Sequence, residues 1–237
     1  MYIKRKIHNF LHPKLGEVWM LHRVVEQRST NPEQRWLEVT PDWLEQKILE
    51  YKSKGYSFLS LDRLPSNFNS QFSIFNSHRW VCITLDDGYA DYISLALPLF
   101  RKLEVPFAVY LTTGFIDNQI PMWWYNGQHL GPTANQVRRL ATDPLCTLGA
   151  HTVSHPHLSQ LSATEQRNEI ESSMRQLEAI TNCPIKHFSY PHGDYNHTTL
   201  DICQSLGFLT AVTTSGRAVR TNTKALEIDR IAIVQPN

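Results

Sequence analysis

The sequence predicts an α/β fold in which helices cover a mostly parallel sheet. Apolar, strand-like runs alternate with helix-like runs along most of the 237 residues, and capping residues precede several of the helical runs. Such alternation is typical of parallel strands joined by helical crossovers, and both a barrel and an open, doubly wound sheet fit it. No Gly-x-Gly-x-x-Gly or phosphate-binding loop supports a nucleotide-binding sheet. The length suits one large domain or two small ones, and no low-complexity linker divides the chain, so one domain over residues 1–237 is expected.

The first half of the chain predicts three strands and two helices. Apolar runs predict strands at residues 17–24, 58–61 and Trp80–Leu85. Thr40 is an N-cap residue followed by Pro41 at the first helical position, so a helix begins there, and Gly55 ends it. Residues 90–103 are expected to form the second helix, and the Asn/Ser-rich residues 67–77 predict a surface loop.

The second half continues the alternation. Strands are expected at residues 106–111, Cys146–Ala150, 185–190, 208–213 and 228–234. A short helix is expected at residues 133–142. A capping box formed by Ser162 and Glu165 predicts a long helix to about residue 180. Asn196 caps a last helix, which ends at Gly207.

Composition narrows the class of protein. The formal net charge is +1, so no basic excess indicates a nucleic-acid partner. The 4 cysteines are widely spaced, which disfavours a cysteine zinc site and suits a reducing compartment. The basic N-terminus has no continuous apolar stretch before Pro13 and Gly16, and no apolar run approaches transmembrane length. A cytoplasmic protein is therefore expected, and its oligomeric state is left open.

Three predicted strands end in polar residues that can carry chemistry. These ends are Asp86-Asp87-Gly88, the segment HTVSH at residues 151–155, and the segment PHGD at residues 191–194. In parallel α/β domains the carboxyl ends of the strands meet at one face, where functional residues collect. The three segments are therefore expected to converge on one site.

The histidine pair in HTVSH indicates a metal site. His151 and His155 lie four residues apart, which on a helical turn places both imidazoles on one face. With a carboxylate from another strand end they make a two-histidine, one-carboxylate set with positions left for water and substrate, as in hydrolytic metal sites. The alternative is a solvated turn with two unrelated histidines.

The adjacent carboxylates of Asp86 and Asp87 need different roles. Neighbouring strand residues point to opposite faces, so both reach one site only if the strand breaks into a turn, which Gly88 permits. One carboxylate then binds metal while the other accepts a proton from water. The alternatives are an ordinary Asp-Gly turn and a glycosidase with two carboxylates, although a glycosidase would not need the histidine pair.

The segments TLDDG, HTVSH and FSYPHG, in this order, resemble the signatures of the polysaccharide deacetylase family, carbohydrate esterase family four. The similarity spans about residues 17–234. It implies a distorted (β/α) barrel with seven or eight parallel strands. It also implies that Asp86 is the general base and that Asp87, His151 and His155 hold one divalent ion. Zinc is favoured over cobalt, nickel, manganese and iron, and the Thr152 hydroxyl would brace the loop.

The resemblance further implies a substrate groove. Pro191 and His192 would form one wall of it, and a backbone N–H near His192 would help to hold the oxyanion. Trp124, in the segment PMWWYNG at residues 121–127, is a candidate for stacking on a sugar ring. A buried plug under a long connection is the competing interpretation of these aromatic residues.

Two departures from the family pattern point to substitute residues. Ser189 stands where many members have the arginine that orients the base, and Arg230, in EIDRIAI, resembles the arginine of a subgroup and is the candidate replacement. The usual C-terminal Leu-His, whose histidine is the general acid, is absent. His22, in WMLHRV, resembles a Tyr-His element in one branch of the family and is the candidate acid. Its alternative is a buried histidine with an ordinary hydrogen bond.

These residues together predict a metal-dependent hydrolase. It would remove N-acetyl or O-acetyl groups from an amino-sugar-containing glycan or glycoconjugate, with no nucleic-acid partner. The alternatives are a hydrolase of non-sugar C–N amide bonds on the same fold and a catalytically degenerate relative that binds glycans. The specific substrate and its chain length are not readable from the sequence.

Overall fold

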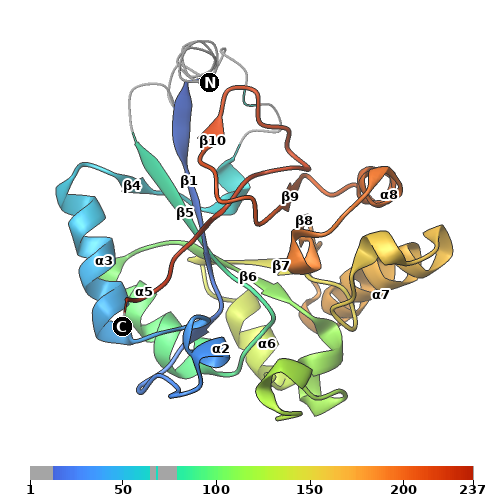
Figure 1. The fold of residues 1–237 in the computed structure, drawn as a ribbon, viewed down its shortest axis with the longest axis horizontal. Coiled ribbons are helices and arrows are strands. Elements are labelled where there is room, and N and C mark those ends of the chain that lie inside the picture. The colour runs from blue at the N-terminus through green and yellow to red at the C-terminus, as the bar shows by residue number, and fades with distance from the viewer. Residues whose placement is uncertain (1–12, 65–67, 69–78, 237) are drawn as a thin grey trace.

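A curled sheet forms the centre of the molecule. The computed structural model describes residues 13–64, 68 and 79–236. Its nine-stranded sheet has the order β10-β1-β5-β6-β7-β8-β9, with β4 beside β5 and β11 beside β1 (Figure 1). The strands are β1 (Lys14–Leu21), β4 (Ser57–Phe58), β5 (Trp80–Leu85), β6 (Phe107–Leu111), β7 (Cys146–Ala150), β8 (His187–Ser189), β9 (Thr210–Val212), β10 (Val219–Arg220) and β11 (Ile231–Ala232). Only the β1–β10 ladder of this sheet is antiparallel among the described residues. The molecule is thus a distorted, incompletely closed (β/α) barrel in a single domain, which confirms the predicted fold class.

Helices surround this sheet, with the short α2 lying beyond the end of β1 (Figure 1). They are α2 (Pro32–Arg35), α3 (Pro41–Ser53), α5 (Leu97–Leu103), α6 (Ala134–Ala141), α7 (Ala163–Thr181) and α8 (His197–Ser205). The predicted caps are present, because the side chains of Thr40, Ser162 and Asn196 accept hydrogen bonds from the first turns of α3, α7 and α8. Local capping chemistry therefore sets where these three helices begin.

The central strand β5 explains where the polar residues gather. All of Trp80–Leu85 is buried, because β1 and β6 flank β5 and apolar side chains cover both of its faces. Its carboxyl end lies beside Leu21 at the end of β1 and Val109 in β6. Asp86 and Asp87 follow directly, at the middle of one edge of the sheet.

Several predicted elements differ from the observed ones. The run 17–24 is split, since β1 ends at Leu21 and β2 (Arg23–Val24) pairs with β3 (Glu38–Val39) in a separate two-stranded sheet. The helix predicted over residues 90–103 opens with a π-helical turn at Tyr92–Ala96. The predicted strand 58–61 is reduced to β4, and 228–234 to β11. The predicted loop 67–77 lies outside the described residues except for Phe68.

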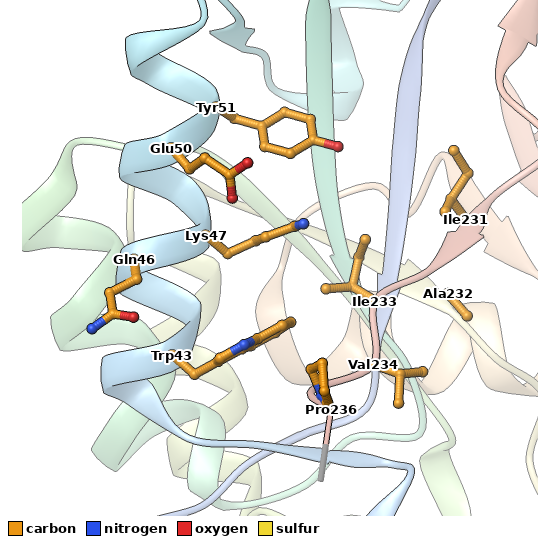
Figure 2. Close-up of a pocket in the computed structure, with 10 residues that line it drawn as sticks. All are labelled: Trp43, Gln46, Lys47, Glu50, Tyr51, Ile231, Ala232, Ile233, Val234 and Pro236. Atoms are coloured by element: carbon orange, nitrogen blue, oxygen red, sulfur yellow. The ribbon is translucent and has the colours of Figure 1, made fainter.

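The outer surface carries a groove between α3 and the segment that follows Arg230. It has a volume of about 480 Å³, and Trp43, Lys47 and Tyr51 project into it from α3 toward Ile233 (Figure 2). The end of the described chain is therefore packed along α3. Within the described part of the chain, no helix is both long and apolar enough to cross a membrane.

Candidate active site

The turn after β5 brings both aspartates to one place. Asp87 and Gly88 adopt the left-handed region, with φ of 76° and 88°. A Cβ on Gly88 would lie 2.9 Å from Cδ2 of Leu111, so both the backbone angle and the space favour glycine. Asp86 and Asp87 are each only 3% exposed. The strand thus ends in a turn at the predicted position, and the turn holds two buried carboxylates side by side.

The loop after β7 brings the two histidines together without a helical turn. Thr152 and His155 have φ values of 65° and 63°, so the expectation of an α-helical i, i+4 pair is wrong in its geometry. The imidazoles still meet, with ring centroids 4.9 Å apart. The Thr152 hydroxyl accepts a hydrogen bond from the His155 N–H at 3.1 Å, and it therefore braces the loop.

Asp87, His151 and His155 form a cluster that could hold a metal ion. Nε2 of His151 and Nε2 of His155 lie 3.5 and 3.4 Å from Oδ1 of Asp87. Two ligands of a tetrahedral ion at about 2.0–2.1 Å are about 3.3–3.4 Å apart, so these distances fit a zinc-sized ion. Nδ1 of His151 donates to the Ser189 carbonyl oxygen at 2.7 Å, which leaves Nε2 facing the carboxylate, as in histidine metal ligands.

The charge states of the cluster also suit a cation. Burial lowers the pKa of His155 to about 3, so its imidazole is neutral near pH 7 and can act as a ligand. Burial alone would raise the pKa of Asp87. The hydrogen bond with His151, followed by the attraction that His155 and His22 exert in their protonated forms at low pH, outweighs burial and lowers that pKa below its usual range. Asp87 is therefore an anion facing two nitrogen ligands.

Asp86 is paired with Arg230. The Arg230 side chain is 0% exposed, and Nη1 and Nη2 donate to Oδ1 and Oδ2 of Asp86, each at 2.6 Å. Nη2 also donates to the Ser189 hydroxyl at 3.0 Å. Burial raises the pKa of Asp86, but the charge and hydrogen bonds of Arg230 outweigh it and lower the pKa overall. Arg230 thus reaches the carboxylate directly beside Ser189.

His22 lies in the break between β1 and β2, at the same end of the sheet. It is half-buried, and its ring lies 5.7 Å from the exposed ring of Trp36. The charge of His22 is among the causes that lower the pKa of both Asp86 and Asp87. Its chain neighbour Leu21 accepts a hydrogen bond at its carbonyl oxygen from the Asp86 N–H at 3.0 Å, so His22 follows a residue that contacts Asp86 directly.

The groove candidates lie around the histidines. Pro191 is buried in a 3₁₀ turn after β8, and the ring of His192 lies 4.5 Å from that of His155. The half-buried ring of Trp124 lies 4.9 Å from His155. The exposed indole of this segment belongs to Trp123, which is 68% exposed, and not to Trp124, the predicted residue.

Two residues that sequence reasoning missed also contact the site. Tyr89 donates from its hydroxyl to Oδ2 of Asp87 at 2.9 Å. Glu169 of α7 accepts from the N–H groups of Val153 and Ser154 at 2.8 and 2.9 Å, which secures the histidine loop. Tyr89 stands close to the Asp-Asp pair in the sequence, but no pattern distinguishes it, and nothing in the local sequence signals the role of Glu169.

Comparison with known proteins agrees with this geometry. The family model for polysaccharide deacetylase matches residues 76–211, more than half of the chain, in a stretch that excludes His22 and Arg230. The Bacillus subtilis protein named "Putative polysaccharide deacetylase YxkH" is 26% identical over 157 residues, which are 66% of this chain and 52% of that protein. The chain therefore spans about half the length of this curated relative.

Solved structures share the fold. The Streptococcus pyogenes deacetylase PplD, solved in complex with acetate, is 27% identical with a TM-score of 0.75, covering 92% of each chain. IcaB from Ammonifex degensii has a TM-score of 0.78 at 18% identity, covering 93% of this chain and 92% of that one, which speaks for the fold alone. The extent of the family match, together with the strand-end motifs, shows that the chain belongs to the polysaccharide deacetylase family.

Proposed function

We propose that the protein is a metal-dependent deacetylase that hydrolyses N-acetyl groups of an amino-sugar-containing glycan or glycoconjugate. The observation that carries this proposal is the cluster of Asp87, His151 and His155 directly beside the buried carboxylate of Asp86. A metal triad needs only one carboxylate. The second, adjacent one lies outside the triad and is the proposed acceptor for the proton transfer that hydrolysis of an amide requires.

In this proposal Asp87, His151 and His155 hold one divalent ion, for which zinc is the favoured identity. The bound ion would polarise the acetyl carbonyl and make water a better nucleophile at neutral pH. Asp86 accepts the proton of the attacking water, and Arg230 keeps Asp86 ionised and fixes its direction. The water oxygen bonds to the carbonyl carbon, and the C–N bond then breaks.

His22 is the proposed general acid. It would donate a proton to the leaving nitrogen, so that the products are acetate and a free amine. Its position supports this role, because it follows Leu21 at the end of β1 and the Leu21 carbonyl oxygen accepts a hydrogen bond from the Asp86 N–H at 3.0 Å. Pro191, His192 and Trp124 are proposed to line the substrate groove, and a backbone N–H near His192 is proposed to help hold the oxyanion. The acetate in the PplD structure is the product that this reaction would release.

Acetate release tests the proposed function. The purified protein should carry about one divalent ion and release acetate from N-acetylated amino-sugar oligomers, and chelation should abolish that release. Asp86→Asn should keep the ion but lose roughly 10²-fold or more in kcat, because the proton acceptor is gone. The matched control is Asp201→Asn, on the exposed face of α8. Sugar binding without acetate release would favour the degenerate relative, and release only from non-sugar amides would favour the other hydrolase.

The leaving group tests His22 separately. His22→Ala should depress kcat strongly on an unactivated acetamide, because an amine leaves poorly without a proton. It should depress kcat much less on an activated acetyl ester, whose leaving group needs little protonation. Equal losses on the two substrates would assign His22 a structural role.

A further inference from the structure

The two carboxylate oxygens of Asp87 face different partners. Oδ1 faces the Nε2 atoms of His151 and His155, at 3.5 and 3.4 Å. Oδ2 accepts a hydrogen bond from the hydroxyl of Tyr89 at 2.9 Å. A carboxylate whose second oxygen is already engaged presents one oxygen in a fixed direction.

The direction of this hydrogen bond is determined by a third residue. Nε1 of Trp124 lies 2.8 Å from the Tyr89 hydroxyl oxygen, and an indole N–H can only donate. The phenol oxygen therefore accepts from Trp124, and its single proton is left for Oδ2 of Asp87. Tyr89 is 0% exposed, so no water competes for that proton.

The same tryptophan also contacts a second member of the cluster. The rings of Trp124 and His155 are 4.9 Å apart, and Phe115 lies 5.4 Å from Trp124 on another side. Asp87 and His155 both have left-handed φ angles, which side chains other than glycine adopt only when their surroundings hold them. Trp124 thus restrains one of these residues by ring contact and the other through Tyr89.

We infer that Tyr89 and Trp124 are positioning residues that hold Asp87 as a one-oxygen metal ligand. The inference rests on the proposed metal site. Groups that orient metal ligands typically contribute about 10–100-fold to metal affinity, because a free carboxylate must be ordered when the ion binds. The hydroxyl of Tyr89 is the direct partner, and the N–H of Trp124 acts through it.

Metal affinity, measured without substrate, tests this inference. The apoprotein is titrated with Zn²⁺ against a chromophoric chelator, and the absorption spectrum of the Co²⁺ form is recorded. Tyr89→Phe should weaken Zn²⁺ binding about 10-fold or more and alter the Co²⁺ spectrum. Tyr125→Phe is the matched control: its ring lies 5.8 Å from that of Tyr89, but its hydroxyl donates to Glu38. It should bind Zn²⁺ within about two-fold of the wild type.

A double variant tests whether Trp124 acts on Asp87 through Tyr89. Trp124→Phe keeps a ring beside His155 but removes the N–H, so it should weaken binding, and Tyr89→Phe/Trp124→Phe should bind no more weakly than Tyr89→Phe alone. If the losses of Zn²⁺ affinity in the double variant were additive, Trp124 would not act through Tyr89. Unchanged binding by a folded Tyr89→Phe protein, or an equal loss in Tyr125→Phe, would overturn the inference while leaving the proposed function intact. A wild-type chain that binds neither ion would overturn both.

Discussion

At the scale of single residues, Arg230 has the most constrained environment near the site. Its guanidinium has five N–H donors, and five hydrogen bonds connect it to Asp86, Thr84, Ser189 and the Thr213 carbonyl oxygen. Two of them form a bidentate pair with Asp86, the strongest geometry available to an arginine and a carboxylate. No other side chain could supply this charge together with all five hydrogen bonds.

Loss of Arg230 should destabilise the fold as well as impair the proposed reaction. Arg230→Met should lower the free energy of unfolding by about 3–5 kcal/mol, because the Asp86 charge is left buried without its partner. Urea unfolding monitored by circular dichroism measures this loss. Arg230→Lys, which keeps the charge but loses the bidentate geometry, should fall between Arg230→Met and the wild type.

The control for this prediction is an exposed ion pair. Arg217 pairs with Asp229 at 3.0 Å but is 72% exposed, so Arg217→Met should cost at most about 1 kcal/mol. Similar losses at positions 217 and 230 would show that the buried pair has no special weight.

Whether the sequence reveals the role of a residue depends on how far along the chain its contact partners lie. Asp86 and Asp87 stand out because two carboxylates end a buried strand, which is a local signal. The contact of Arg230 with Asp86 spans 144 residues, and only the family resemblance pointed to Arg230. The chain Trp124–Tyr89–Asp87 depends on the packing of a loop against a turn 35 residues earlier, and no spacing rule describes it.

At the scale of elements, the sequence predicted those strand bounds and helix starts that interactions between neighbouring residues determine. The bounds of β5 and β7 match the prediction, and the capped starts of α3, α7 and α8 match as well. The ends of short strands do not match, because pairing with a neighbour decides where a strand stops. For example, β11 contains only the residues that pair with Trp19 and Met20 of β1.

The structure brings the rings of His151 and His155 together, but residues 151–155 do not form the helical turn that was expected. A four-residue spacing suggested a helical turn, whereas left-handed residues at Thr152 and His155 bring the rings together. Such a loop needs external support, which Glu169 gives from α7 and Thr112 gives by donating to the His151 carbonyl oxygen at 3.0 Å. These supports come from other elements, so the local sequence could not reveal the conformation.

At the scale of the whole molecule, both edges of the sheet carry carboxylates with lowered pKa values. Asp86 lies at the carboxyl edge. Asp62 lies at the opposite edge, where a hydrogen bond with His187 is the largest influence and, with one from Thr147, lowers the pKa below the usual range against the effect of burial. Lowered pKa values mean that the folded state holds these protons less tightly than the unfolded state. Their contribution to stability is thus present above the unfolded pKa of about 3.9 and is lost as the pH falls below it.

The free energy of unfolding, measured with urea in the presence of a chelator, should therefore fall as the pH drops below about 4. Asp62→Asn should have a shallower fall, because one of the contributing carboxylates is gone. An acid limb of unchanged slope in that variant would contradict the contribution of Asp62.

The pairing of Asp86 with Arg230 also has a consequence for synthesis. A ribosome adds residues at roughly 5–20 per second, so the 144 residues between the two positions take about 7–30 s to emerge. During that interval the strand bearing Asp86 has left the ribosome, but the guanidinium that neutralises it does not yet exist. Burying the Asp86 charge without its partner is costly, so we expect the carboxyl end of β5 to stay open to water until Arg230 has emerged.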